Sequence, residues 1–446
     1  MKLEMETLKK KHTWDLVKPP PGANIMDSMW VYDIKWGGEG NRIKDKARLV
    51  GKGYTQQLGV DYHETWAAVT RLESVRMTAA IAAKLDLKLW RIDFVGAYLN
   101  SLTKEDIYMK QPEGFVEPGY DHVCKLVHTI YGTMQGAHDW YETLMETYKK
   151  LGYTTSRADP CVRYKREGDG YTITDTYTDD VFGASKSDRE IEERKEEIGK
   201  EWEIKDVGES EYFLGMRVQQ DLEKGTIRLT HWEHVITRFD LAHIQPRNIP
   251  LPVGIALDND MSPQTDSEKK DMHDKPYRPI LGSIMWAQLA TRPDLSFAVS
   301  LLSRFQGNPG IEHWKALMHV VGYIKNTLDF GLTYLRDVDL FPHAFVDADY
   351  GGCHDTRHST SGYVFLMAGS PVTWSSKRQP TVALLTVEAE YVAMSRCTQQ
   401  MVWMQSWLDE VAIERVGPGL IKGDSRGAVA LMKNTKDHAK VKHIDI

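Results

Sequence analysis

The segment DTYTDDVFG (Asp175–Gly183) places two adjacent carboxylates, Asp179 and Asp180, inside a run that otherwise favours β-strand. Residues 171–184 have the composition of two strands that meet at this pair, so a hairpin is predicted. The flanking residues are aromatic and β-branched, unlike the Gly and Asn of the favoured two-residue turns. Because Asp is also a common turn residue, two interpretations stay open: a surface turn, or a site that needs two negative charges.

Asp93 is a candidate partner for this pair. It follows the run LDLKLWRI, which alternates as a half-buried strand should, and it precedes FVGAYLN. A carboxylate at the end of a strand, beside a hairpin that carries two more, could bind a hard divalent cation such as Mg²⁺. Two such ions about 3.5–4 Å apart can activate an attacking hydroxyl and stabilise a leaving pyrophosphate.

A second set of carboxylates lies near the C-terminus. Asp347 ends the strand-like run AFVDADY, Glu390 lies in the first turns of a predicted helix, and Asp424 ends LIKGD. Acidic groups at strand ends and on a facing helix could gather into one metal-binding cluster suited to phosphodiester hydrolysis. Asp445 is a weaker candidate for a fourth member. The alternative for Glu390 is that it merely favours a helix N-terminus through the helix dipole.

The bulk properties are those of a globular chain. At 446 residues, with 41% hydrophobic and 27% charged residues, two or three domains are expected. No apolar run is long enough to cross a membrane, and no secretory signal is recognisable, so we expect no membrane association and an intracellular location. The family resemblance given below implies a cytoplasmic particle or the nucleus. The four scattered cysteines argue against a zinc module or a disulfide framework.

The net charge of −7 alone disfavours nucleic-acid binding. The charge is uneven, however, because residues 41–53 carry five cations and a single Asp. Local basic patches therefore matter more than the total.

The pattern along the chain changes twice. The first part mixes strand-like runs with helical ones, as an α+β domain does, and a charged helix is predicted over 188–202 after Ser187. Residues 250–276 are rich in Pro and Asp and predict an exposed connection, followed by helical material that includes 313–328. From about residue 342 the pattern predicts three strands, a helix, and then a strand and a helix, typical of a compact α/β domain.

At these residues the sequence resembles a known family. An ordered series of motifs covers nearly the whole chain and is similar to the reverse transcriptase–ribonuclease H region of copia-type LTR-retrotransposon polyproteins. The series includes KARLVGKGYTQQLGVDYHETWAAV, IDFVGAYLNS, CKLVHTIYGTMQGAHDW, YTDDV, ATRPDLSFAVSLLSRF, DADYGGCHDTRHSTSGYVF and KHIDI. One motif would be weak, whereas the ordered series is specific.

The resemblance implies an α+β right-hand polymerase (fingers, palm, thumb) followed by a helical connection and an α/β ribonuclease H-like domain. The implied divisions are 1–252 for the polymerase fingers, palm and start of the thumb, 253–340 for the linker and connection, and 341–446 for the ribonuclease H-like domain. We expect this last domain to be truncated at Ile446.

The resemblance also implies roles for single residues in the first site. Asp93, Asp179 and Asp180 match metal ligands, Tyr98 matches the aromatic residue under the incoming sugar, and Gln135 matches a glutamine beside nucleotide and template. Lys46 and Arg48 lie where cations could clamp triphosphate oxygens. The alternatives from composition are a core aromatic for Tyr98 and a solvated basic strand for the two cations. Residues 212–215, YFLG, resemble the hairpin that grips the primer end.

In the second domain Asp347, Glu390 and Asp424 match metal ligands, and Asp445 matches a further catalytic carboxylate. The implied cofactor is Mg²⁺, with Mn²⁺ as the alternative ion. The implied partners are an RNA template, a DNA primer, the RNA–DNA hybrid and dNTPs, with RNA-directed DNA polymerase and ribonuclease H as the activities.

Several positions depart from the family pattern. Met134, Ala137 and His138 replace a usual Lys and Pro-Arg around Gln135, and Leu385 replaces a usual Ser before the helix that carries Glu390; Ala68 and Ser101 also differ. Two cations that would face template or triphosphate are therefore absent or weakened. A degenerate retrotransposon remnant with only ribonuclease H activity, or with only nucleic-acid binding, is the alternative function.

Overall fold

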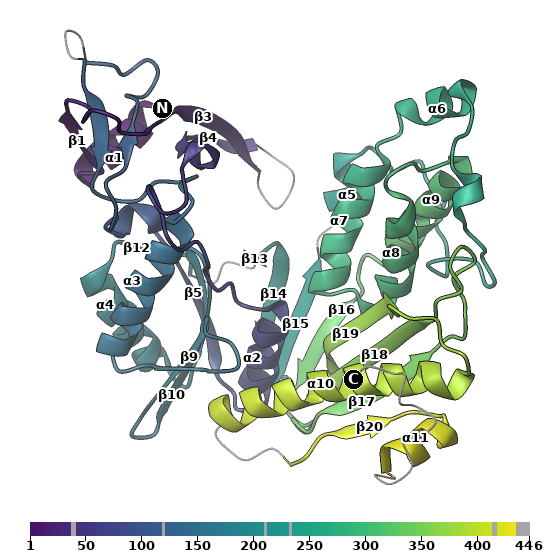
Figure 1. Ribbon diagram of the computed structural model, residues 1–446. Helices are drawn as coiled ribbons and strands as arrows, with labels where there is room; N and C mark the ends of the chain where they lie inside the picture. Colours follow the sequence, from purple (N-terminus) through teal and green to yellow (C-terminus); the bar gives the residue numbers. More distant parts are fainter. Residues whose placement is uncertain (37–41, 118–120, 209–211, 232–233, 413–416, 434–446) are drawn as a thin grey trace. The chain divides into compact units, whose positions relative to one another are not determined.

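The chain forms two compact units in the computed structural model, which describes residues 1–36, 42–117, 121–208, 212–231, 234–412 and 417–433. The first unit contains residues 1–70 and 90–209, and the second contains residues 71–89 and 210–446. Both units mix helices and strands, as Figure 1 shows. The α+β class predicted for the chain is therefore confirmed.

A six-stranded sheet forms the centre of the first unit, in the order β12-β5-β11-β10-β9-β8. Tyr177 at the end of β10 pairs with Asp180 at the start of β11, which leaves Thr178 and Asp179 as a two-residue turn. Thr178 adopts a positive φ of 57°, the backbone conformation that such a tight turn requires. This confirms the hairpin predicted over 171–184. The strands are β5 (Lys88–Phe94), β8 (Thr154–Thr155), β9 (Val162–Glu167), β10 (Gly170–Tyr177), β11 (Asp180–Ser185) and β12 (Ile204–Asp206).

Two helices, α3 (Gly136–Lys150) and α4 (Asp188–Glu201), pack on this sheet. Helix α4 begins after Ser187, whose hydroxyl accepts the N–H of Glu190, so the predicted helix start is confirmed. The packing fixes the positions of β5 and the β10–β11 hairpin. The shared core comprises Trp90, Ile92, Phe94, Ala97, Trp140, Leu144, Tyr148, Tyr153, Val181, Ile191 and Ile198.

The rest of the first unit is a small sheet and a hairpin. The sheet has the order β1-β7-β6-β2, and β3 pairs with β4 in an antiparallel hairpin whose register places Lys46 opposite Asp33. Lys46 and Arg48 are two residues apart on β4 and so share one face. The elements are α1 (Lys2–Lys10), β1 (Trp14–Val17), β2 (Ile25–Met26), β3 (Ser28–Trp36), β4 (Arg42–Gly51), η1 (Gly53–Thr55), η2 (Ala97–Asn100), β6 (Tyr108–Met109) and β7 (Val123–Leu126).

The second unit begins with helix α2 (Leu72–Lys84), which packs against an antiparallel sheet of order β13-β14-β15-β16. Buried Arg76 on α2 donates hydrogen bonds to the carbonyl oxygens of Val372, Leu289 and Ala290, and so ties the helix to the C-terminal part of the chain. The strands are β13 (Tyr212–Phe213), β14 (Met216–Asp221), β15 (Thr226–His231) and β16 (Gly331–Leu335).

A group of helices with a common apolar core follows in the second unit. The predicted helix over 313–328 is confirmed as α9, whereas the predicted exposed connection over 250–276 contains two helical segments, η3 and α6. The helices are α5 (His234–Arg238), η3 (Asn259–Met261), α6 (Asp266–His273), α7 (Tyr277–Ala290), η4 (Pro293–Leu295), α8 (Ser296–Leu302), η5 (Ser303–Phe305) and α9 (Ile311–Asn326).

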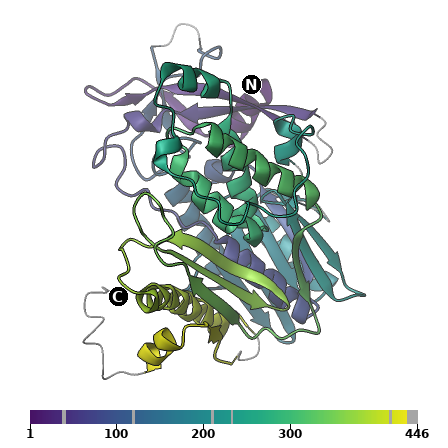
Figure 2. The ribbon, with the colours of Figure 1, turned by 90° about the vertical axis from the view of Figure 1, so that its right-hand side faces the viewer.

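The C-terminal part of the second unit has the predicted order of three strands, a helix, a strand and a helix. Its sheet has the order β19-β18-β17-β20, with β17 and β20 parallel and the other pairs antiparallel. The long helix α10 packs against β17 and β18, as Figures 1 and 2 show. The elements are β17 (His343–Ala348), β18 (Thr360–Met367), β19 (Ser370–Arg378), α10 (Thr386–Val411), β20 (Leu420–Lys422) and α11 (Arg426–Lys433).

The three-domain division at 252 and 340 stays a prediction, because both boundaries fall inside the second unit. The four cysteines are buried and form no disulfide, as their spacing predicted. In the described ranges, no helix is long and apolar enough to cross a membrane.

Helix α10 begins without a side-chain cap, and this leads to a stability prediction. Leu385 occupies the N-cap position in an extended conformation, while the Glu388 carboxylate accepts the N–H of Leu384 at 2.8 Å. The N–H of Glu388 donates to the Leu385 carbonyl oxygen at 3.1 Å, so the first turn lacks only a side-chain acceptor. We expect Leu385→Ser to supply that acceptor and to stabilise the protein by about 1 kcal/mol. Chemical denaturation measures the change. Leu384→Ser is the matched control, because a hydroxyl one position earlier cannot cap; equal effects of both variants would contradict the capping argument.

Two candidate active sites

The first candidate site is a cluster of three carboxylates in the second unit. Phe345 on β17 pairs with Lys422 on β20 in parallel register, so Asp347 and Asp424, each two residues further on, emerge at the same edge of the sheet. Glu390 lies in the second turn of α10, which packs against β17. Each residue offers one carboxylate oxygen, and these oxygens all lie within 4.8 Å of one another. The structure therefore brings together three of the four residues predicted for this site.

The environment of Glu390 indicates what this cluster can hold. Glu390 is only 9% exposed, and its Oε2 atom is buried with no hydrogen-bond partner. Burial, together with the negative charges of Asp347 and Asp424, raises the pKa of Glu390 to about 7. A divalent cation would reduce the repulsion among the three carboxylates and would give the Oε2 atom of Glu390 a partner. Hard cations prefer carboxylate oxygens as ligands. The three residues present thus fit a magnesium site.

The raised pKa of Glu390 predicts how stability depends on pH in the absence of metal. Between about pH 4.5 and pH 7 the folded protein binds more protons than the unfolded chain, so stability falls as the pH rises through this range. We expect a loss of about 3.5 kcal/mol at most, since one pKa unit corresponds to about 1.4 kcal/mol. Urea denaturation in EDTA at several pH values measures it. If the Glu390→Gln variant lost the same amount of stability between these pH values, the pH dependence would have to come from another titrating group.

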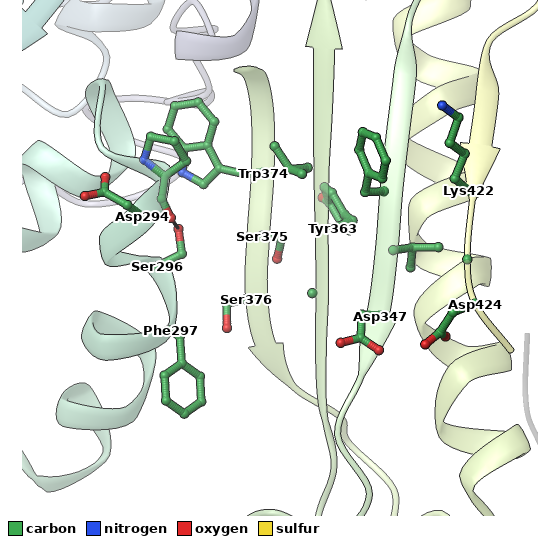
Figure 3. A pocket seen from close by; sticks show the side chains of 16 residues that line it. Asp294, Ser296, Phe297, Asp347, Tyr363, Trp374, Ser375, Ser376, Lys422 and Asp424 are labelled. Atoms are coloured by element: carbon green, nitrogen blue, oxygen red, sulfur yellow. Dashed lines mark hydrogen bonds between the residues drawn. The ribbon is translucent and has the colours of Figure 1, made fainter. Parts of the chain in front are cut away.

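Asp347 and Asp424 border a groove of about 690 Å³ on the open face of this sheet. Figure 3 shows the two carboxylates side by side on neighbouring strands, with Ser296 and Phe297 of α8 across the groove. Phe297 and Phe345 are 47% and 45% exposed. The cluster is therefore open to a large substrate rather than enclosed.

The second candidate site surrounds the β10–β11 hairpin of the first unit. The N–H of Phe94, which follows Asp93, donates a hydrogen bond of 2.8 Å to the carbonyl oxygen of Asp179. This contact places the end of β5 beside the turn, so Asp93 and the Asp pair are neighbours. Among the described residues, a group of three or more such residues whose ligand atoms all lie within 4.8 Å of one another occurs only in the Asp347 cluster. Asp93, Asp179 and Asp180 are thus adjacent without forming an equally close group.

Two cations on β4 lie near these carboxylates. Burial lowers the pKa of Lys46, and so does the charge of Arg48, whereas Asp179 and Asp93 act in the opposite direction. The Arg48 guanidinium lies 5.7 Å from the centre of the Tyr131 ring. Lys46 therefore lies within electrostatic reach of Asp179 and Asp93, although its side chain is exposed, and a binding role for Lys46 and Arg48 stays a prediction.

Tyr98 also belongs to this neighbourhood. Its ring meets that of Tyr131 edge to face, with a centroid distance of 4.9 Å. Burial raises the pKa of Tyr98, and the charge of Asp179 adds to the effect. Tyr98 is half-buried, so part of the ring packs in the protein and part is accessible.

Sequence reasoning missed two residues of this site. The pKa of Arg91 is lowered by burial, with Asp180 and Asp93 opposing that effect, so its guanidinium lies near both carboxylates. Arg91 lies two residues before Asp93 on the same strand, so both side chains point to the same face of the sheet. This spacing could have indicated from the sequence that Arg91 belongs to the site. The ring of Tyr131 contacts both Arg48 and Tyr98. Because these partners are distant in sequence, no local pattern could predict that Tyr131 belongs to the site.

Gln135 is buried inside the first unit, and its expected place beside nucleotide and template stays a prediction. It is 1% exposed, accepts a hydrogen bond from Gln56 at 3.2 Å and donates one to the carbonyl oxygen of Asp61 at 3.1 Å. His138, at the position of a usual Arg, contacts the Trp66 carbonyl oxygen at 2.7 Å and Glu142 at 3.4 Å. Both side chains thus bind other parts of the first unit. Asp445 lies outside the described residues.

The segment YFLG (212–215) forms a hairpin, as the sequence predicted. Phe213 pairs with Met216 across the turn, and Leu214 and Gly215 both have positive φ, at 49° and 77°. The hairpin belongs to the second unit.

Comparison with known proteins identifies the protein family to which the chain belongs. Residues 11–253 match the family described as reverse transcriptase (RNA-dependent DNA polymerase), which is more than half of the chain. The chain belongs to this family.

Several of the similar proteins come from transposons. The chain is 36% identical to the retrovirus-related Pol polyprotein from transposon TNT 1-94 of Nicotiana tabacum, covering 100% of this chain and 34% of that protein. It is 32% identical to the corresponding polyprotein from transposon RE2 of Arabidopsis thaliana, covering 97% of this chain and 30% of that protein. The chain is also 32% identical to a putative transposon Ty5-1 protein of Saccharomyces cerevisiae, and the match covers the whole length of that protein.

The resemblance to copia-type polyproteins is thereby confirmed. The chain spans about a third of the length of the two plant polyproteins.

Proposed function

We propose that the chain is the RNA-directed DNA polymerase of a copia-type retrotransposon, joined to a ribonuclease H. Membership of the reverse transcriptase family over residues 11–253 is the observation that supports the polymerase best. The close cluster of Asp347, Glu390 and Asp424 supports the hydrolytic activity. Template RNA, primer DNA, the RNA–DNA hybrid and dNTPs are the partners that these two activities require.

In the polymerase site, Asp93, Asp179 and Asp180 would hold Mg²⁺. Bound Mg²⁺ lowers the pKa of an attacking hydroxyl and neutralises charge on the leaving pyrophosphate. Lys46 and Arg48 would bind the triphosphate oxygens, since charge-assisted hydrogen bonds to phosphate are strong. Tyr98 would lie against the sugar, where its ring leaves no space for a 2′-hydroxyl. These residues act by positioning and by neutralising charge.

In the hydrolytic site, Asp347, Glu390 and Asp424 would hold Mg²⁺, whose contribution when bound is to activate water and to stabilise charge on the phosphodiester. Glu390 must lose its proton to become a ligand, and its raised pKa makes metal binding weaker below neutral pH. The sheet β19-β18-β17-β20 covered by α10 supports an α/β ribonuclease H-like domain over 341–446.

Two assays of the whole chain test the proposal. In the first, a DNA primer annealed to an RNA template is extended with dNTPs and Mg²⁺. In the second, the labelled RNA strand of an RNA–DNA hybrid is cleaved in Mg²⁺. We expect both activities, and a well-folded preparation that shows neither would refute the proposal.

A degenerate remnant that retains only ribonuclease H activity is the second candidate. It is favoured by the inward-facing Gln135 and by His138, which is occupied by contacts within its own unit. Hybrid cleavage without primer extension is the result that this candidate predicts.

A further inference from the structure

The two-residue turn of the β10–β11 hairpin is held to the rest of the first unit through its main chain. The carbonyl oxygen of Asp179 accepts the N–H of Phe94 at 2.8 Å. The carbonyl oxygen of Thr178 accepts the indole N–H of Trp140, a residue of α3, at 2.7 Å. Neither contact uses a side chain of the turn. The backbone that carries the Asp pair is therefore fixed from two sides, by β5 and by α3.

Trp140 also contacts the strand that carries Asp93. Its ring meets that of Phe94, the next residue along β5, edge to face at a centroid distance of 5.2 Å. Trp140 is only 2% exposed and belongs to the core that α3 and α4 share with the six-stranded sheet. One buried side chain thus touches both segments of the chain that carry the three carboxylates of this site.

The turn needs such a hold because Thr178 is in an unfavourable conformation. Its φ of 57° lies in the left-handed region, which a β-branched residue adopts only at a steric cost. The like charges of Asp93, Asp179 and Asp180 add a repulsion when no cation is bound. The position of the turn therefore depends on the hydrogen bonds to its two carbonyl oxygens.

We propose that Trp140 is a positioning residue of the polymerase site, which holds the three carboxylates close enough to share a divalent cation. This inference rests on the polymerase function proposed above. Because Trp140 is buried, it acts through the main chain of Thr178 and the ring of Phe94 rather than on a substrate. Mg²⁺ tolerates little departure from octahedral geometry, so a displaced turn binds it less tightly.

Trp140→Phe tests the hydrogen bond, because phenylalanine keeps an aromatic ring in the core and lacks the indole N–H. In the whole chain in EDTA we expect the Phe94 N–H to exchange with deuterium about tenfold faster, because a carbonyl oxygen left without its donor loosens the turn. Mass spectrometry of peptides that contain Phe94 measures this exchange.

The same variant should alter the metal requirement of one activity only. We expect the Mg²⁺ concentration for half-maximal primer extension to rise about tenfold, with KM for primer–template little changed. Hybrid cleavage by the same preparation should keep its rate and its Mg²⁺ requirement, because the Asp347 cluster belongs to the second unit. A purely structural role of Trp140 would not move the metal requirement of extension alone.

Trp202→Phe is the matched control. The Trp202 ring packs against the same core and meets the ring of Trp140 at a centroid distance of 5.8 Å. Its indole N–H donates to the Thr147 hydroxyl at 3.2 Å. The variant therefore removes an equal group beside Trp140 without affecting a bond to the turn. It should change neither the exchange of the Phe94 N–H nor the Mg²⁺ requirement of extension.

A second substitution tests the strain at Thr178. Glycine adopts a positive φ without the steric cost, so Thr178→Gly makes the turn less dependent on its hydrogen bonds. In the Trp140→Phe background we expect Thr178→Gly to lower the Mg²⁺ requirement and to slow the exchange of the Phe94 N–H, each about threefold, and to have a smaller effect in the wild-type chain. Strictly additive effects of the two substitutions would contradict the inference.

An unchanged exchange rate of the Phe94 N–H, or an unchanged Mg²⁺ requirement, in Trp140→Phe would overturn the inference. Equal changes in Trp202→Phe would overturn it as well, because they would show a general weakening of the core. If the wild-type chain extends no primer, the proposed polymerase function fails instead. The exchange of the Phe94 N–H in the single and double variants needs no catalysis and then decides on Trp140 alone.

Discussion

Asp347→Asn is expected to reduce cleavage of an RNA–DNA hybrid by on the order of 100-fold or more while leaving primer extension in place. The substitution keeps the shape of the side chain and removes one of three charges whose oxygens lie within 4.8 Å of one another. The remaining Glu390 and Asp424 offer one ionised ligand fewer, so a hard divalent cation is held less tightly and with a changed geometry. Cleavage of a labelled RNA strand under single-turnover conditions measures the effect.

Loss of folding would not explain that result. The charge of Asp347 contributes to raising the pKa of Glu390 to about 7, so the cluster repels itself when no metal is bound. In EDTA at pH 7 we therefore expect Asp347→Asn to be at least as stable as the wild-type protein. Asp409→Asn, an exposed carboxylate on the same helix as Glu390, is the matched charge control. Full cleavage activity in a pure Asp347→Asn preparation would exclude this residue from the site.

Asp179→Asn is expected to have the complementary effect: primer extension falls by on the order of 100-fold or more, and hybrid cleavage is retained. Asp179 lies in the turn of the β10–β11 hairpin, and its backbone carbonyl accepts a hydrogen bond from Phe94 that the substitution leaves intact. Only the side-chain charge next to Asp93 and Lys46 is altered. Extension of a labelled primer on an RNA template, followed over a range of dNTP concentrations, measures the loss.

Asp169→Asn controls for this second prediction. Asp169 is exposed in the turn between β9 and β10 of the same sheet, so the variant removes an equal charge from another hairpin. Equal losses of extension in the two variants would show that the charge of Asp179 has no special role. Loss of cleavage as well as extension in Asp179→Asn would mean that the two activities do not reside in separate sites.

Elements whose signals are local were predictable from the sequence. The strands and hairpin around Asp179 follow from alternating polarity, and the start of α4 follows from Ser187 with Glu190 three residues later. The gathering of Asp347, Glu390 and Asp424 was also predictable, because strand ends and the first turns of a packed helix converge.

Features that depend on packing between distant segments were not predictable. Gln135 faces inward because Gln56 and Asp61, more than seventy residues earlier, provide its hydrogen-bond partners. Tyr131 reaches the candidate site around the β10–β11 hairpin through contacts with Arg48 and Tyr98. Neither the burial of Gln135 nor a role for Tyr131 could be read from the local sequence.

The assignment of residues 71–89 to the second unit has a consequence for how the chain is made. Every residue of helix α2 from Ser74 to Ala83 is buried, and the helix packs on β15, β16 and β19, which are synthesised more than a hundred residues later. During synthesis on the ribosome this helix therefore emerges long before the strands that cover it, and its buried face stays exposed until they are made. A fragment that ends at residue 252 would lack β16 and β19 and would leave much of α2 uncovered, so aggregation of such a fragment would reflect a missing partner rather than an unstable polymerase.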